Sequence, residues 1–185
     1  MKYRTMGKLG IQSSAFGLGC MRFNGKASGD STIDEQKAIS LIRKAIDGGV
    51  NYIDTAYVYL DKTSEIVLGK VLLDGYRDKV TIATKVPPDL VNSRADLERV
   101  LDEELKKLQT DHIDFYLMHA MNKQKWEHMK SIGACEFFDD IQDRNPAYRH
   151  AHPLRHQAAG RHHHQGGDRR SQEEVQPGWS RHSAA

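Results

Sequence analysis

The sequence lacks long apolar runs, and none reaches the roughly 18 residues that mark a membrane-spanning helix. Its first residues, Met-Lys-Tyr-Arg-Thr-Met-Gly-Lys, contain no apolar segment of the kind found in secretion signals. We therefore expect a cytoplasmic protein with no membrane partner. The sequence also lacks an excess of one charge, because it contains 27 Lys and Arg residues and 25 Asp and Glu residues. This balance gives no reason to expect nucleic-acid binding.

Cysteine is scarce, and the two cysteines present, Cys20 and Cys135, are far apart in the sequence. They form neither a Cys-x-x-Cys pair nor a spacing typical of metal ligands. We expect two buried, reduced thiols. No metal site is predicted for the main part of the chain.

Lysine is absent from the last 44 residues, 142–185, which contain 7 of the 10 histidines and 7 arginines. The only large aliphatic residues there are Leu154 and Val175. Such a segment buries too little apolar surface to offset its chain entropy, so we predict a disordered His/Arg-rich tail. A shifted reading frame would explain the abrupt change in composition. Metal binding by His162–His164 and nucleic-acid contacts by the arginines are the alternatives.

Residues 1–141 predict an N-terminal hairpin followed by alternating strands and helices. The hairpin covers residues 2–14, and Ala15–Met21 is an apolar run typical of a buried strand. Thr32 and Glu35 form a capping box that opens the first helix. Further strands are expected at 50–55, 80–85 and 113–119. The helices between and after them start at Ser64 and at Ser93, and a last helix contains Trp126, Met129, Phe137 and Ile141.

Strands that alternate with helices favour a parallel sheet with right-handed crossovers, in either a doubly wound fold or part of a (βα)₈ barrel. The barrel is favoured because Asp54, Lys85 and His119 each stand at the carboxyl end of a predicted strand, and Tyr59 follows soon after Asp54. In a barrel these ends share one face, where active sites lie. Taken singly, each residue has an ordinary structural explanation, but the repeated position favours a site.

These four side chains suit proton transfer to an oxygen atom that gains negative charge. A tyrosine hydroxyl is a weak acid, with an unperturbed pKa of roughly 10, and an adjacent ammonium favours its ionised form. Asp54 can hold Lys85, and a neutral His119 can donate a hydrogen bond to a carbonyl oxygen. The matching reaction is reduction of a carbonyl group by hydride, which a cofactor must supply.

Four segments of the sequence resemble the aldo-keto reductases. Asp54-Thr55-Ala56-Tyr57-Val58-Tyr59, followed by Ser64-Glu65-x-x-Leu68-Gly69, is similar to that family's Asp-Thr-Ala-x-x-Tyr signature. The segments 82–86 and 114–119 resemble its lysine and histidine strands, and 16–22 resembles its first barrel strand. Gly-Cys-Met-Arg at 19–22 and the segment after His119 are more similar to a microbial subgroup that often carries an iron–sulfur module.

The resemblance implies a (βα)₈ TIM barrel that reduces aldehydes or ketones to alcohols with NADP(H). Tyr59 would be the general acid, tuned by Lys85 and Asp54, and His119 would orient the small carbonyl substrate. The family's nicotinamide cofactor, expected as NADPH, would lie near Asp54 and the segment Gly19, Cys20, Met21 and Arg22. The family does not use a Gly-x-Gly-x-x-Gly turn, and the sequence has none.

The resemblance covers residues 1–141, the length of an N-terminal half barrel with four βα units. A complete (βα)₈ barrel needs roughly 200 residues or more. The family's remaining cofactor motifs and iron–sulfur cysteines do not occur in 142–185. We therefore expect a truncated, incomplete barrel with little or no activity of its own. The alternative is a non-catalytic half barrel that self-associates through exposed sheet edges or binds a partner.

Overall fold

The structure, a computed structural model, describes residues 1–7, 9–23 and 34–144. All of them belong to one compact unit, Met1–Arg155. The predicted tail, 142–185, lies outside the described residues apart from its first three positions, which continue a helix to Arg144. Its histidine cluster therefore stays a prediction. No helix in the described ranges combines the length and apolar character needed to cross a membrane.

The predicted N-terminal hairpin is present. Strands β1 (Tyr3–Thr5) and β2 (Gln12–Ser14) pair antiparallel, with Tyr3 opposite Ser14. Asn51 fastens this hairpin to the rest of the unit, because its Oδ1 accepts from the Ser14 amide at 2.7 Å and its Nδ2 donates to the Gln12 carbonyl at 2.7 Å. The residue after Asn51 opens the next strand, so the hairpin is tied to the amino-terminal end of the sheet.

Four parallel strands form the second sheet of the described residues, in the order β3-β4-β5-β6. They are β3 (Leu18–Gly19), β4 (Tyr52–Asp54), β5 (Thr81–Val86) and β6 (Phe115–Met118). The order follows the sequence, and right-handed crossovers then place successive helices on the same face. A doubly wound sheet would reverse its order part-way. The fold is therefore the barrel type, and the described residues build four βα units of a (βα)₈ barrel.

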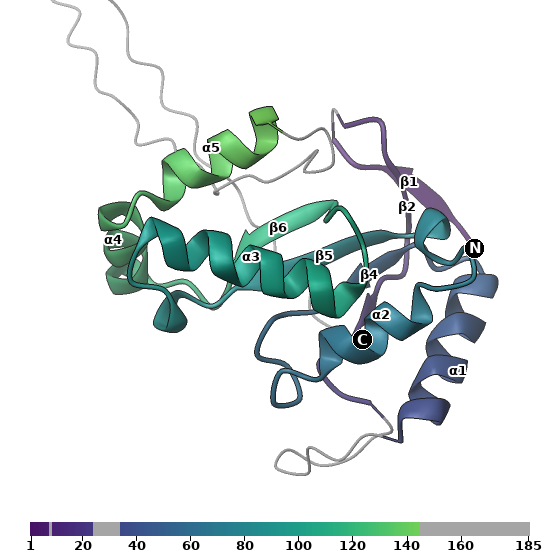
Figure 1. Ribbon diagram of the computed structural model, residues 1–185. Coiled ribbons are helices and arrows are strands. Elements are labelled where there is room, and N and C mark those ends of the chain that lie inside the picture. The colour runs from purple at the N-terminus through teal and green to yellow at the C-terminus, as the bar shows by residue number, and fades with distance from the viewer. Residues whose placement is uncertain (8, 24–33, 145–185) are drawn as a thin grey trace, which may run out of the picture. The chain divides into compact units, whose positions relative to one another are not determined.

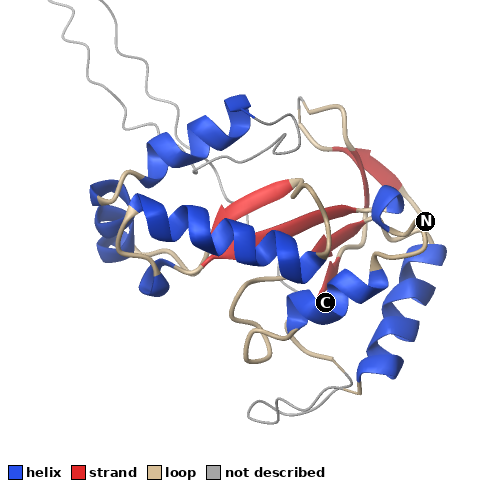
Figure 2. Cartoon of the chain, viewed as in Figure 1, coloured by secondary structure: helices blue, strands red, loops and turns tan. Residues whose placement is uncertain are grey.

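The helices follow each other around this sheet (Figure 1). They are α1 (Glu35–Asp47), α2 (Ser64–Val71), α3 (Arg94–Leu108), α4 (Lys123–Ser131) and α5 (Ala134–Arg144), with short 3₁₀ turns η1 (Arg77–Lys79) and η2 (Pro88–Leu90). Contacts join α1 to α2, α2 to α3, and α3 to α5. Coloured by secondary structure, the view shows α2 and α3 over the same side of the parallel sheet (Figure 2).

The first helix begins later than the capping box predicted. Its N-cap is Asp34, whose Oδ1 accepts from the Lys37 amide at 3.1 Å. Thr32, the predicted cap, lies outside the described residues. An aspartate at this position satisfies one of the unpaired amides of the first turn, which is why the helix can start there. Ala38, Ile42 and Ile46 form the buried stripe of this helix, and Ile39 and Ala45 beside them are partly buried.

Two other boundary predictions were wrong. The apolar run 15–21 contributes only Leu18 and Gly19 to the sheet, and Phe16 is 61% exposed. The predicted last helix is two helices, because the chain turns at Gly133 with φ +75°. Glycine adopts this left-handed conformation without the steric cost that a side chain would add. Met129 and Phe137 are nevertheless both buried, so the apolar pattern correctly predicted burial on each side of the break.

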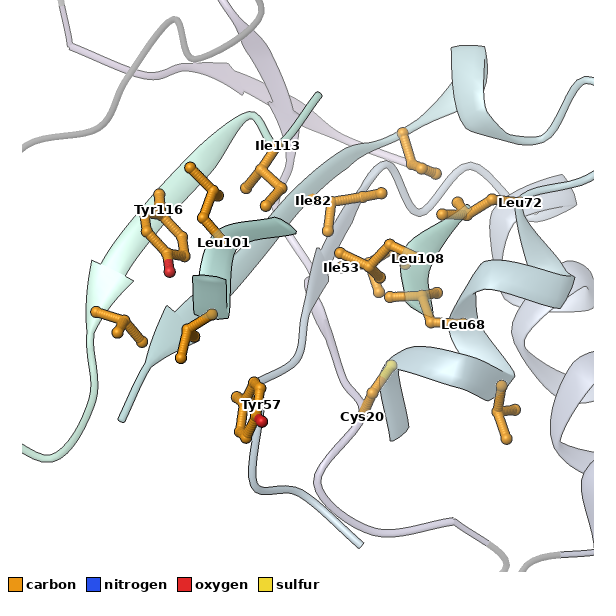
Figure 3. Close-up of a cluster of buried hydrophobic side chains, with 14 of the residues drawn as sticks. Cys20, Ile53, Tyr57, Leu68, Leu72, Ile82, Leu101, Leu108, Ile113 and Tyr116 are labelled. Atoms are coloured by element: carbon orange, nitrogen blue, oxygen red, sulfur yellow. The ribbon is translucent and has the colours of Figure 1, made fainter. Parts of the chain in front are cut away.

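The core fills the layer between the parallel sheet and its helices (Figure 3). Ile53 and Ile82 from the strands meet Leu68 and Leu108 from α2 and α3, and all four are fully buried. The two helices approach closely at Gly69, where an added Cβ would stand 2.2 Å from the Lys107 carbonyl oxygen. Only glycine fits this crossing. Ile66 lies on the side of α2 away from this core and is 39% exposed.

An ion pair between Arg77 and Asp114 joins β5 to β6. Asp114 Oδ2 accepts from the Ile82 amide at 2.8 Å and pairs with Arg77 Nη2 at 2.7 Å. Arg77 also donates to the carbonyl oxygens of Val80 and His112. A guanidinium presents several donors in a rigid plane and can join several acceptors at once. The Arg77–Asp114 pair holds the amino-terminal ends of the two strands, and so fixes the register of the residues at their carboxyl ends.

Candidate active site

The register of the parallel sheet places the predicted residues on one face. Gly19 is level with Asp54, Asp54 with Ala83, and Lys85 with Leu117. Paired residues of parallel strands share a face, and side chains two residues apart point the same way. Lys85, two beyond Ala83, and His119, two beyond Leu117, therefore face the same side as Asp54. Ile53, Ile82 and Tyr116 are on the other side, in the core beneath the helices.

Lys85 is the centre of this site. Its ammonium lies 2.7 Å from Asp54 Oδ1, 2.6 Å from the Thr55 carbonyl oxygen and 3.5 Å from the Tyr59 hydroxyl. A lysine ammonium carries three protons, and here it meets three acceptors. The side chain is only 14% exposed, and Asp54 is 32% exposed. At this burial the Lys85–Asp54 pair is less screened by water than a surface ion pair.

Tyr59 and His119 stand edge to face. Their ring centroids are 5.5 Å apart with an interplanar angle of 81°, and both side chains are partly buried. The His119 backbone amide donates to the Val86 carbonyl at 2.9 Å, which extends the β5–β6 pairing to the residue that carries the imidazole. The two polar groups therefore have fixed positions on the same face as Lys85.

The electrostatic setting lowers the pKa of His119. Partial burial is the main cause, and the positive charges of Lys85 and then Lys125 add to it. Asp54 and Asp89 oppose the effect without reversing it. The imidazole is therefore neutral near pH 7, and it can donate a hydrogen bond from one ring nitrogen without carrying a positive charge.

The sequence did not predict that Ser64 and Thr55 hydrogen-bond next to the site residues. Ser64 Oγ donates to the Cys20 carbonyl at 2.7 Å, and lies 2.9 Å from Thr55 Oγ1. Ser64 was identified only as a helix start, and Thr55 only as part of the motif. The signal available was their position beside Asp54 and Glu65 within a motif of closely spaced polar residues.

A buried carboxyl pair was also missed. Glu65 and Glu104 are both fully buried, and Thr84 Oγ1 donates to Glu65 Oε1 at 2.6 Å and lies 3.4 Å from Glu104 Oε1. Burial raises the pKa of both carboxyls, and the neighbouring Glu65 adds to the effect on Glu104. Lys107 Nζ, 3.3 Å from Glu65 Oε2, supplies one positive charge for the pair. Burial and the neighbouring Glu65 carboxyl therefore favour the protonated form of Glu104.

The residues of the predicted cofactor segment differ in their burial. Gly19 is exposed on the Asp54 face, and a Cβ placed on it would meet nothing within 4 Å. Met21 and Arg22 are exposed as well. Cys20 differs: its side chain is fully buried on the helix side, and burial, with Asp54 nearby, raises the pKa of its thiol to about 12. The open Gly19 backbone and the two exposed side chains fit the edge of a nucleotide site, whereas the Cys20 thiol does not face it.

Within the ranges that the structure describes, no group of three or more His, Cys, Asp or Glu residues could hold a metal ion. The site consists of one ammonium, one carboxylate, one phenol and one imidazole. Such a set can deliver a proton and stabilise a developing oxyanion.

Comparisons with known proteins identify the family of this chain. The model of the aldo/keto reductase family matches residues 15–144. The Bacillus subtilis aldo-keto reductase YhdN is 39% identical over 127 residues, which cover 64% of this chain and 38% of that protein. The uncharacterized oxidoreductase YrpG of Bacillus subtilis is 35% identical over 141 residues, covering 67% of this chain and 41% of that protein. The chain thus spans about two fifths of the length of these relatives.

Solved structures show the same fold. A Klebsiella pneumoniae aldo/keto reductase, in complex with NADP and acetate, matches with a TM-score of 0.58 and 28% identity over 73% of this chain and 44% of that one. The holo form of a Bacillus halodurans aldo-keto reductase matches with a TM-score of 0.63 and 28% identity over 78% of this chain and 47% of that one. The family model covers well over half of the sequence. This chain belongs to the aldo/keto reductase family.

Proposed function

We propose that the site of this chain reduces the carbonyl group of an aldehyde or ketone to an alcohol, with NADPH as the reductant. The observation that carries the proposal is the convergence on Lys85: its ammonium contacts both Asp54 and the Tyr59 hydroxyl, and the His119 ring stands against Tyr59. NADPH is proposed because structures of aldo-keto reductase from Klebsiella pneumoniae were solved in complex with NADP and with NADPH. When bound, it supplies the hydride.

The substrate oxygen fits between the Tyr59 hydroxyl and the His119 ring. His119, neutral because its pKa is lowered, donates a hydrogen bond that orients the carbonyl. As the carbonyl carbon gains hydride, the oxygen gains negative charge, and the Tyr59 hydroxyl gives it a proton. The product is the alcohol, and Tyr59 is left as a phenolate. The Lys85 ammonium, 3.5 Å from the Tyr59 oxygen, stabilises that negative charge.

Asp54 and the Thr55 carbonyl keep Lys85 in place for this role. Both accept hydrogen bonds from its ammonium, so the remaining proton is directed at Tyr59. Gly19, Met21 and Arg22 would line the near edge of the nucleotide site, with Asp54 close to the nicotinamide end. The proposed substrate is a small aldehyde or ketone. We place the reaction in the cytoplasm, where NADPH is the usual reductant.

A graft tests this proposal. Residues 15–144 of this chain replace the matching segment of the Bacillus subtilis reductase YhdN, so that the site stands in a full-length protein. We expect NADPH-dependent reduction of a simple aldehyde at a rate well above that of the 185-residue chain alone. A folded graft that binds NADPH but does not turn over aldehyde would contradict the proposed chemistry. The proposed division into a half barrel (1–141) and a tail (142–185) predicts that the graft needs nothing from the tail.

A second candidate function is self-association. Among the described residues, β3 and β6 each pair with one neighbouring strand, so each presents an edge of backbone donors and acceptors. Two copies related by a two-fold axis along the barrel would bring β6 of each beside β3 of the other, with all strands parallel. Light scattering during size-exclusion chromatography of the 185-residue chain should give the mass of a dimer. A monomer at all concentrations would exclude this function.

A further inference from the structure

Tyr59 precedes a turn that the backbone does not favour by itself. Leu60, Asp61 and Lys62 have φ values of 50°, 50° and 68°, three successive residues with side chains in the left-handed region. A conformation of this kind persists only when its surroundings hold it. Within the turn, the Thr63 amide donates to the Leu60 carbonyl at 3.0 Å and the Ser64 amide to the Tyr59 carbonyl at 3.3 Å. The Thr63 hydroxyl also donates to the Leu60 carbonyl, and the Tyr59 amide donates to the Ala56 carbonyl at 3.1 Å. These bonds hold the backbone of the turn but do not involve the Tyr59 side chain.

The segment before Tyr59 is fastened to α3 through Tyr57. Its side chain is buried, and its hydroxyl donates to Glu103 Oε2 at 2.6 Å. Lys107 Nζ stands 3.6 Å from the centre of the Tyr57 ring, within the range of a cation–π interaction. Burial and the neighbouring Glu103 raise the pKa of Tyr57 to about 12, so its hydroxyl remains a donor at neutral pH.

The segment after Tyr59 is fastened to the same lysine. Glu65, the second residue of α2, accepts from Lys107 Nζ at 3.3 Å and from the Thr84 hydroxyl at 2.6 Å. Thr84 directly precedes Lys85 in β5. Lys107 therefore contacts a residue on each side of the strained turn, and Lys62 Nζ of the turn lies 5.2 Å from the same Tyr57 ring.

We propose that Tyr57 and Lys107 are positioning residues, which clamp the two ends of the 60–62 turn to α3 and thereby set the distance between the Tyr59 hydroxyl and the Lys85 ammonium. The structural role of Tyr57 and Lys107 does not depend on the proposed function. Only the expected effect on kcat rests on it. The contact that the clamp sets is sensitive, because 3.5 Å is the outer limit of a hydrogen bond and a small displacement of Tyr59 would break it.

Hydrogen exchange of the full chain tests the clamp without any need for activity. Tyr57→Phe removes the hydroxyl donor, and Lys107→Met removes the ammonium but keeps the aliphatic stem. Both should speed exchange of the Thr63 and Ser64 amides tenfold or more, with the amides of the β5–β6 ladder unchanged. Glu103→Gln keeps an acceptor for Tyr57 and should leave exchange close to the unsubstituted rate. Unchanged Thr63 and Ser64 exchange in Tyr57→Phe would overturn the proposal, even if Lys107→Met fails to fold.

A matched control is present elsewhere in the unit. Tyr76 donates to Asp47 Oδ2 at 2.9 Å, and Lys79 Nζ lies 4.1 Å from its ring centre, so it makes the same kinds of contact away from the turn. Tyr76→Phe should not alter Thr63 or Ser64 exchange. If it speeds exchange as much as Tyr57→Phe does, the effect is a general loss of stability and the clamp is wrong.

In the graft with YhdN, Tyr57→Phe should lower kcat about tenfold and leave the KM for aldehyde nearly unchanged. This second readout separates the two proposals. Faster exchange with an unaltered kcat would retain the clamp of the turn and show that the reaction does not depend on the Tyr59–Lys85 contact. Unaltered exchange would reject the clamp whatever the kcat.

Discussion

Lys85 Nζ lies 2.7 Å from Asp54 Oδ1, across two neighbouring parallel strands and at the same end of each. The Thr55 carbonyl is closer still, at 2.6 Å, so the ammonium is held by a carboxylate and a backbone dipole together. In the graft, Lys85→Met should lower kcat about 100-fold, within the range that a positioned acid–base group contributes. Lys85→Arg should not restore it, because a planar guanidinium cannot occupy the point between three acceptors that one ammonium fills. Recovery of kcat in Lys85→Arg would show that positive charge alone is sufficient.

The α2–α3 crossing predicts a large effect of a single methyl group. Gly69→Ala places a Cβ 2.2 Å from a backbone oxygen, which a side-chain rotation cannot relieve. The helices must separate, and we expect a loss of unfolding free energy of about 1–3 kcal/mol in urea titrations. Gly19→Ala is the matched control, because a Cβ there meets nothing within 4 Å. Equal stability of the two variants would contradict the close helix approach.

The buried carboxyl pair predicts a pH dependence of stability. Burial, with the neighbouring Glu65 carboxyl, raises the pKa of Glu104 in the folded protein well above the usual value of a glutamate in an unfolded chain. Between those two pKa values the folded state binds more protons than the unfolded state, so stability falls as pH rises through this window. Glu104→Gln keeps a neutral, hydrogen-bonding side chain and should flatten this fall. Unfolding curves measured at a series of pH values compare the two proteins, and parallel profiles would mean that Glu104 does not carry the proton.

The two cysteines should react differently. Cys20 is fully buried and its thiol pKa is raised to about 12, whereas Cys135 is partly exposed. A thiol reagent at pH 8 should modify Cys135 within minutes, and Cys20 only on unfolding, because the thiolate is the reactive form. Mass spectrometry of tryptic peptides identifies the modified residue. Rapid labelling of Cys20 in the native chain would show that its side chain faces the solvent or the nucleotide site.

Much of the fold and the site could be predicted because the information was local. Strand ends carried Asp54, Lys85 and His119, and the alternation of side chains in parallel strands brought them to one face. What failed depended on contacts between distant segments. Glu104 falls in the apolar stripe of α3, between Leu101 and Leu108, yet a glutamate predicts an exposed face unless its buried partners on α2 and β5 are known. Leu105, expected in that stripe, is only half-buried. Gly133 is a local signal for a left-handed turn, but a single glycine is also tolerated inside a helix, so it did not by itself predict the break.

The most direct test of the account compares two tyrosines on the same face of the sheet. In the graft, Tyr59→Phe removes the proposed proton donor, whereas Tyr52→Phe alters a ring that packs 5.7 Å from Phe115. The measurement is kcat for NADPH-dependent reduction of a simple aldehyde, with NADPH binding followed by fluorescence. We predict that Tyr59→Phe lowers kcat at least about 100-fold with NADPH affinity retained, and that Tyr52→Phe changes kcat less than about threefold. A Tyr59→Phe graft that keeps most of its kcat would contradict the central claim.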